Sequence, residues 1–237
     1  MADTPDTKPR RRFLQALAIV PASTLATGAA LQTAQAETAA ATAGVQYDPI
    51  YFTKPEWAFI QAAVDHLIPA DELGPGAVAA GVPEFIDRQM ETAYGHGKLW
   101  YMQGPFHPEV DATYGHQINQ VPRDIYRHGI AACDDYCRKQ LGKTFAELDK
   151  PAQEQVLKDL ESGKIQFETV PAKTFFGFLL DNTKEGFFAD PMYGGNKHMA
   201  GWKMIGFPGA RGDFADWPAK GNVKYPYGPV SISGEKA

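Results

Sequence analysis

The stretch that most constrains the fold of this chain is residues 122–141, where apolar side chains recur at spacings of three and four. A proline opens this stretch and Gly142 follows it, as is typical of the first turn of a helix and of the position just past its end. The spacing predicts an amphipathic helix with one face in a core. The apolar residues expected on that face are Ile125, Tyr126, Ile130, Cys133, Cys137 and Leu141.

Other segments carry similar helix signals. Residues 53–56 read Thr-Lys-Pro-Glu, a capping box with a proline inside the first turn, and predict that a helix follows. Residues 83–90 predict a second helix. Another capping box at 144–147 precedes a helix expected through residues 149–163, and the Phe-rich segment 175–180 predicts a buried helix.

Strand signals are weak, because no segment alternates apolar and polar residues for long. We therefore expect a mostly α protein with an irregular helical domain. Residues 186–229 contain nine Gly, five Pro and nine aromatic residues and show neither a helical nor a strand period. This composition predicts a long Gly/Pro/aromatic-rich C-terminal loop region that wraps a partner.

The N-terminus has the order of a twin-arginine signal peptide, which carries folded proteins across the inner membrane into the periplasm. A mild Ala/Thr-rich apolar stretch follows the arginines, and Ala34-Gln35-Ala36 supplies a cleavage site after Ala36. Residues 1–36 are thus expected to be the signal, 37–46 a flexible linker and 47–237 a single helical domain. The residues that carry the export signal are Arg10, Arg11, Phe13 and Leu14.

Two other interpretations of the N-terminus remain, a membrane anchor and a basic arm for nucleic acid. An anchor wants about 20 strongly apolar residues, whereas this stretch is broken by Pro21 and Gly28. Removing residues 1–36 takes the net charge from −5 to −7. An acidic chain argues against nucleic acid and against direct adhesion to anionic lipid, so any membrane association is expected only through a complex.

No motif for a cofactor or for catalysis is present. The glycines of residues 74–81 have the wrong spacing for a dinucleotide fingerprint, and residues 95–98 lack the features of a phosphate loop. No Gly-x-Ser-x-Gly elbow occurs, and the six histidines are scattered. We therefore assign no catalytic, cofactor-binding or metal-binding residue in this chain.

Cys133 and Cys137 are the only cysteines and lie four residues apart on the predicted helix 122–141. This spacing stacks them on one face. An oxidising compartment favours a disulfide, within the chain or to a partner, but the geometry within one helix resists it. Buried thiols and a bridge therefore both remain open.

Two segments near the C-terminus carry a family resemblance. Residues 185–196 read Glu-Gly-Phe-Phe-Ala-Asp-Pro-Met-Tyr-Gly-Gly-Asn, and residues 201–209 read Gly-Trp-Lys-Met-Ile-Gly-Phe-Pro-Gly. They resemble the gluconate 2-dehydrogenase subunit 3 family, the small subunit of a membrane-bound FAD-dependent sugar-acid dehydrogenase. The resemblance spans about residues 48–212.

The resemblance implies an assembly of three parts: a large subunit that carries FAD, a multihaem cytochrome c subunit at the membrane, and this small subunit. The chain would hold no cofactor, since FAD and haem c would lie in its partners. It would support twin-arginine export and assembly of the FAD subunit. The complex would oxidise D-gluconate to 2-keto-gluconate, or a related sugar or sugar acid, at the periplasmic side of the inner membrane.

We expect Gly194, Gly195 and Asn196 to form a tight turn with positive φ. The turn would present Tyr193 and Trp202, and together with Trp217 these residues form a candidate partner interface. The same residues would also serve if they only folded the loop.

Two other classes of function compete with the small subunit. One is a free-standing periplasmic carbohydrate-binding protein that stacks sugars on Trp202 and Trp217. The other is an independent hydrolase, for which no nucleophile and base are visibly paired in the sequence.

Overall fold

The computed structural model describes residues 47–215, 217–221, 223 and 225–237. These residues belong to one compact unit, Tyr47–Ala237. The proposed export signal and the proposed linker lie outside the described residues, so both stay predictions.

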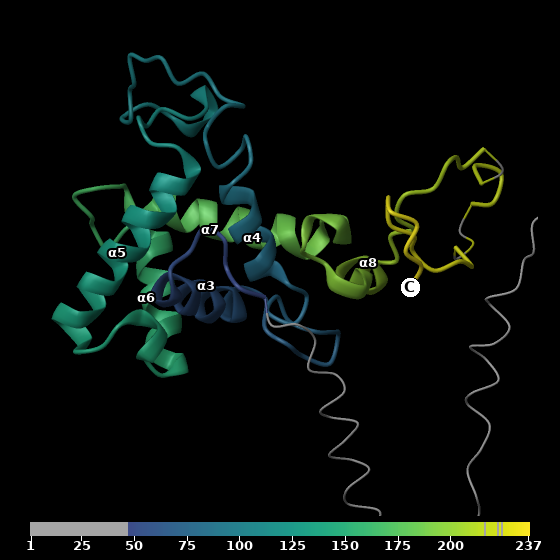
Figure 1. Ribbon diagram of the computed structural model, residues 1–237, viewed down its shortest axis with the longest axis horizontal. Helices are drawn as coiled ribbons and strands as arrows, with labels where there is room; N and C mark the ends of the chain where they lie inside the picture. Colours follow the sequence, from purple (N-terminus) through teal and green to yellow (C-terminus); the bar gives the residue numbers. More distant parts are fainter. Residues whose placement is uncertain (1–46, 216, 222, 224) are drawn as a thin grey trace, which may run out of the picture. The chain divides into compact units, whose positions relative to one another are not determined.

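The described part of the chain is helical, as expected from the sequence, and contains isolated β-bridges but no strand or sheet. Figure 1 shows α7 with α3, α4 and α5 arranged around it. The helix α7 contacts α3, α4, α5, α6 and α8, so it is the element on which the others pack. No helix in this part of the chain is both long enough and apolar enough to span a membrane.

The first two helices form where the sequence predicts them. They are α3 (Lys54–Leu67) and α4 (Val82–Met90). The backbone N–H and the hydroxyl of Thr53 both donate to Glu56 Oε2 at 2.8 Å, which satisfies a donor at the start of α3. Gly81 precedes α4 with a φ of 79°, a conformation that glycine adopts without steric cost.

The helix α5 spans Pro122–Leu141, the bounds predicted from the sequence, and Gly142 ends it with a φ of 77°. Five of the six expected core residues are buried. Leu141 is the exception, because its side chain in the last turn is 46% exposed. At Gly129 an added Cβ would overlap the ring of Phe175, so the missing side chain allows α5 to approach α7 closely.

The second capping box and the next helix also form. The box starts the 3-10 helix η2 (Phe145–Glu147), and the backbone N–H and hydroxyl of Thr144 donate to the Glu147 carboxylate. The helix α6 spans Lys150–Ser162, and its N-cap Asp149 accepts a hydrogen bond from the backbone N–H of Ala152 at 3.1 Å. The elements α3, α6, α7 and η2 share the core around Phe59, Phe145, Val156, Leu160, Phe175 and Leu179.

The chain after residue 180 is more regular than its sequence indicates. The helix α7 spans Ala172–Phe188 and thus continues two turns beyond the segment predicted to be helical. The short helix α8 (Ala200–Ile205) and the 3-10 helices η3 (Pro191–Tyr193) and η4 (Lys197–Met199) follow it. The expectation that residues 186–229 lack regular structure is therefore wrong for residues 186–205. A further 3-10 helix, η1 (Ala112–Tyr114), precedes α5.

A buried carboxylate anchors the start of the domain. Asp87 on α4 is fully buried, and its Oδ2 accepts hydrogen bonds from the Tyr47 hydroxyl at 2.7 Å and the Ile50 N–H at 2.8 Å. Its Oδ1 accepts from the N–H groups of Tyr51 and Phe52 at 3.1 and 2.9 Å. Burial, and then the hydrogen bond to Asp87, raise the pKa of Tyr47, so this hydroxyl remains a donor at neutral pH.

We expect the Asp87→Asn variant to lose about 3 kcal/mol of unfolding free energy, because an amide replaces a buried acceptor that receives four hydrogen bonds. Urea denaturation followed by circular dichroism measures the change. Asp48→Asn is the matched control, since Asp48 is exposed and its replacement should change stability by less than about 0.5 kcal/mol. Equal stabilities of the two variants would contradict this role of Asp87.

Candidate partner-docking surface

The segment that follows α7 is held by a second buried carboxylate, Asp190. Its Oδ1 accepts a hydrogen bond from the backbone N–H of Met192 at 3.1 Å, which caps η3. Its Oδ2 accepts from the N–H of Ile232 at 2.7 Å. Asp190 therefore joins the turn after α7 to the last residues of the chain.

The glycine turn has two of the three predicted conformations. Gly194 and Asn196 adopt positive φ, at 98° and 45°. Gly195 does not have a positive φ. Only glycine fits at this position for a steric reason, because an added Cβ would overlap the carbonyl oxygen of Gly186 on α7. The turn thus packs directly on the backbone of α7, and Gly195 is explained by close approach rather than by φ.

Asn196 is fully buried and links both sides of the turn. Its Nδ2 donates to the carbonyl of Ala189 at 2.8 Å, and its Oδ1 accepts from the N–H of Gly201 at 2.8 Å. The following residues His198 and Met199 also have positive φ, at 57° and 54°. Side chains rarely adopt this conformation, so the surrounding hydrogen bonds must hold the backbone there.

The segment is also attached to α4. The backbone N–H of Lys197 donates to the carbonyl of Ala80 at 2.9 Å, and its Nζ forms an ion pair with Glu84 at 2.6 Å. The side chain of Glu84 is mostly buried and also pairs with Arg88. These contacts give the segment a defined position on the helices, which a docking surface requires.

Tyr193 and Trp202 lie in different environments. Tyr193 is 47% exposed and available to a partner. Trp202 is only 6% exposed, its indole N–H donates to the carbonyl of Phe188 at 2.7 Å, and its ring packs against Phe207. The contacts of Trp202 therefore serve the fold of this segment, and its ring is not presented at the surface.

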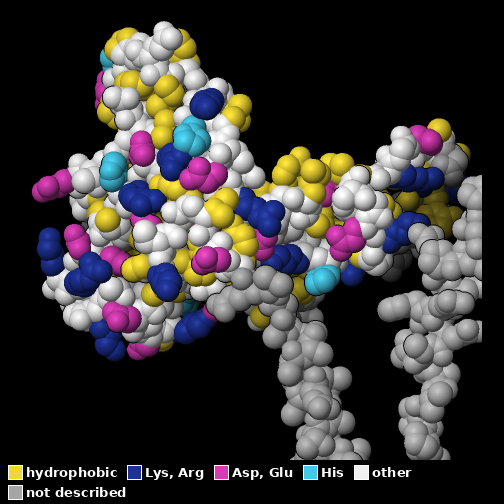
Figure 2. Space-filling model, in the orientation of Figure 1, with side chains coloured by type: hydrophobic (Ala, Val, Ile, Leu, Met, Phe, Trp, Pro, Cys, Tyr) yellow, Lys and Arg dark blue, Asp and Glu magenta, His cyan; other side chains and the backbone are white. Residues whose placement is uncertain are grey.

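Large apolar side chains are exposed around this segment. Figure 2 shows hydrophobic side chains gathered where α7 ends and the next turns follow. Such a concentration is unusual on a surface that stays in water and is typical of an interaction site. We call these side chains, which are between 38% and 59% exposed, the apolar docking residues: Phe188, Met192, Tyr193, Met204, Ile205 and Phe207.

Trp217 belongs to a separate aromatic group. Its half-buried ring lies 5.1 Å from the ring of Tyr225, and the Lys220 ammonium lies 4.9 Å from its centroid. Arg211 donates to the Tyr225 hydroxyl at 3.1 Å. No ring contact joins Trp217 to Tyr193 or Trp202 among the described residues, so the structure does not unite all the residues of the predicted interface.

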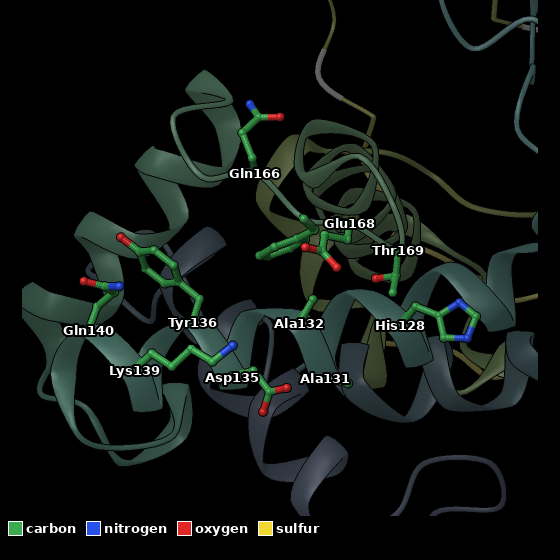
Figure 3. Close-up of a pocket in the computed structure, with 11 residues that line it drawn as sticks. His128, Ala131, Ala132, Asp135, Tyr136, Lys139, Gln140, Gln166, Glu168 and Thr169 are labelled. Atoms are coloured by element: carbon green, nitrogen blue, oxygen red, sulfur yellow. The ribbon is translucent and has the colours of Figure 1, made fainter.

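A groove of about 360 Å³ lies between α5 and the segment 166–169. Figure 3 shows His128, Asp135 and Lys139 along α5 and Glu168 on the facing segment. His128 pairs through Nδ1 with the side-chain amide of Gln120 at 3.2 Å, and no hydroxyl or thiol in the described part of the chain hydrogen-bonds to it. Among the described residues, the groove therefore offers no paired nucleophile and base.

Within the described residues, no group of three or more His, Cys, Asp or Glu side chains is placed to hold a metal ion.

Cys133 and Cys137 are free thiols that are both buried. They lie on the core face of α5. The neighbouring thiol of Cys137, and then burial, raise the pKa of Cys133 well above its ordinary value. A bridge from either thiol to a partner stays a prediction.

Comparison with known proteins decides the family. The family model described as gluconate 2-dehydrogenase subunit 3 matches residues 54–209. The chain belongs to this family. Searches of curated proteins and of solved structures found no match.

The family description makes this subunit-3 chain a component of a multi-subunit dehydrogenase. The matched residues begin at the first residue of α3 and end just after the apolar docking residues. Trp217 lies beyond the match. Sequence reasoning singled out Tyr193 but missed the other five docking residues, whose only signal was apolar character without a helical period.

We expect the native subunit-3 chain to react slowly with a thiol reagent such as Ellman's reagent and to release two equivalents after unfolding in guanidinium, because both thiols are shielded by the core. Absorbance at the colour-forming wavelength counts the thiols. The control is the Cys133→Ser/Cys137→Ser double variant, which should give none. An unfolded, unreduced chain that releases no thiol would instead show a disulfide.

Proposed function

We propose that this chain is the non-catalytic small subunit of a periplasmic flavoprotein–cytochrome c dehydrogenase. It docks onto the large subunit that carries FAD and supports its assembly and twin-arginine export. A multihaem cytochrome c subunit completes the complex and attaches it to the inner membrane. The substrate is D-gluconate, oxidised to 2-keto-gluconate, or a related sugar or sugar acid.

The observation that carries this proposal is the family match together with the apolar docking residues that the match includes. Aromatic and methionine side chains are enriched at the centres of protein interfaces. Here they project from a segment that Asp190, Gly195 and Asn196 hold in one conformation. A surface held rigid before binding loses little conformational entropy on association, which favours a stable complex.

The docking residues can be tested by co-purification. With an affinity tag after Ala237, the chain isolated from its native cells should bring along a protein that contains FAD and one that contains haem c. We expect Ile205→Asp to reduce the recovered FAD at least tenfold, because Ile205 is 59% exposed and a charge would be buried without a partner at the interface. Absorbance of the purified material measures flavin and haem.

The matched control for that substitution is Leu141→Asp, at a side chain that is 46% exposed in the last turn of α5. This variant should recover FAD at the level of the unaltered chain. Circular dichroism confirms that both variants fold. Recovery of the tagged chain without flavin, or flavin bound by the isolated chain itself, would overturn the proposal.

Shared export can be tested at the paired arginines. Replacing Arg10 and Arg11 by lysine should leave the FAD-containing subunit and its dehydrogenase activity in the cytoplasm, because the export machinery reads these arginines. Fractionation of cells followed by an activity assay measures this. Arg12→Lys is the control, since this position of the motif accepts any residue. Normal periplasmic activity in the double variant would exclude shared export.

A further inference from the structure

An aromatic hollow of about 380 Å³ opens on the side of α7, apart from the docking residues. Tyr94 and Trp100, from the segment between α4 and α5, form one wall. The floor comes from α7, whose contributing residues are spaced about one turn apart. These residues are Thr174, Gly177, Phe178, Asp181, Asn182 and Glu185.

Gly177 keeps the floor of the aromatic hollow open. A glycine in the middle of a helix destabilises it by about 1 kcal/mol relative to alanine. The two buried glycines of α5 and α7, Gly129 and Gly186, each have a neighbouring side chain that would collide with a Cβ, whereas Gly177 is only half-buried. An added Cβ at Gly177 would meet nothing within 4 Å, so close packing within the chain does not require this glycine.

The aromatic wall is fixed by ring packing. The centroid of Trp100 lies 5.8 Å from those of Tyr94 and Phe178, at interplanar angles of 83° and 59°. His116 packs against Trp100 at 4.5 Å and bonds through Nε2 to the backbone carbonyl of Gln120 at 2.8 Å. The rings therefore hold a preformed apolar surface beside α7.

A buried amide fixes the polar side of the hollow. Asn182 Nδ2 donates to the Tyr94 hydroxyl at 2.9 Å and to Glu185 Oε2 at 2.8 Å, while its Oδ1 accepts from the Tyr126 hydroxyl at 3.0 Å. Burial, and then the nearby carboxylate of Glu185, raise the pKa of Tyr94 to about 12. Tyr94 is therefore uncharged at neutral pH, and the carboxylates supply the negative charge of the lining.

Several polar groups of the lining have no partner within the described part of the chain. They include the indole N–H of Trp100, the hydroxyl of Thr174 and the Oε1 atom of Glu185. A hydroxyl group both donates and accepts hydrogen bonds, so it matches carboxylate acceptors and N–H donors together. A quaternary ammonium would use neither donor. Asp181 forms an ion pair with Lys184 at 2.7 Å, so the charge that would repel a carboxylate ligand is chiefly that of Glu185.

We propose that the aromatic hollow binds a small neutral polyhydroxylated molecule, a sugar ring or a polyol. Its carbon face packs on Trp100, and its hydroxyls bond to Glu185, Asp181 and Thr174. The site is distinct from Trp202 and Trp217. It depends on no part of the docking function, because none of the docking residues lines it and binding is measured on the isolated chain.

The test is calorimetric titration of the purified full chain with D-glucose, D-sorbitol, D-gluconate and choline. We expect a neutral sugar or polyol to bind with a dissociation constant on the order of 1 mM and gluconate to bind at least tenfold more weakly. Gly177→Leu should weaken binding of the neutral ligand at least tenfold, because its side chain would occupy the hollow, where an added Cβ meets no atom within 4 Å. Gly212→Leu, also at an open position, is the control and should bind normally.

A second pair of variants tests the charge argument. Asp181→Asn with Glu185→Gln keeps the shape of the lining and removes its negative charge, so gluconate should bind closer to the level of the neutral ligand. Binding unaffected by Gly177→Leu, gluconate binding as tight as the neutral ligand in the unaltered chain, binding of choline alone, or no binding of any probe would each overturn the proposal.

Discussion

The rest of the structure depends on the packing of the other helices against α7. Its buried face meets α3, α4, α5 and α6, and the glycine contact between Gly129 and the ring of Phe175 shows how closely α5 approaches it. Burial of large aromatic and aliphatic side chains is the dominant favourable contribution in such a core. Because α7 is held on these sides, its remaining surface and its C-terminal end have defined positions. The aromatic hollow lies on the remaining surface of α7, and the docking residues surround its C-terminal end.

The main effect of the buried polar groups is to fix the conformation of the loops that bond to them. Asp87, Asp190 and Asn196 are buried, and each accepts a backbone hydrogen bond from another segment of the chain. The donors to Asp87 and Ile232, the donor to Asp190, lie in irregular backbone, whereas the donor to Asn196 is the N–H of Gly201 at the start of α8. Burial of a carboxylate is costly unless its oxygens are satisfied. Each of these side chains therefore favours one arrangement of its loop over all others, which is how a chain with much irregular backbone retains a single surface.

Sequence reasoning succeeded where the signal was local. The cap at Gly142, the capping boxes at Thr53 and Thr144 and the period of α5 all depend on residues within a few positions of one another. It failed where the outcome depends on distant partners. The final turns of α7 carry the charged residues Asp181, Lys184 and Glu185 on their exposed face, so the apolar pattern gave no sign that the helix continues. In α8, Met204 and Ile205 face outward, so this helix has no apolar period. Asp87 had no signal, since its donors lie 35 to 40 residues away. The docking residues were predicted only in part, because their exposure also depends on contacts between distant residues. Trp202 was expected at the surface because the sequence pattern gives no sign of its hydrogen bond to the carbonyl of Phe188.

The hydrogen bond between Ile232 and Asp190 gives the last residues of the chain an unusual importance. Chain ends are ordinarily the places where a protein tolerates trimming best. Here the loss of residues 232–237 would take away the N–H donor to a buried carboxylate beside the turn after α7. The Oδ2 atom of Asp190 would have to recruit water or shift with its backbone, so the loss would reach the segment that carries the docking residues.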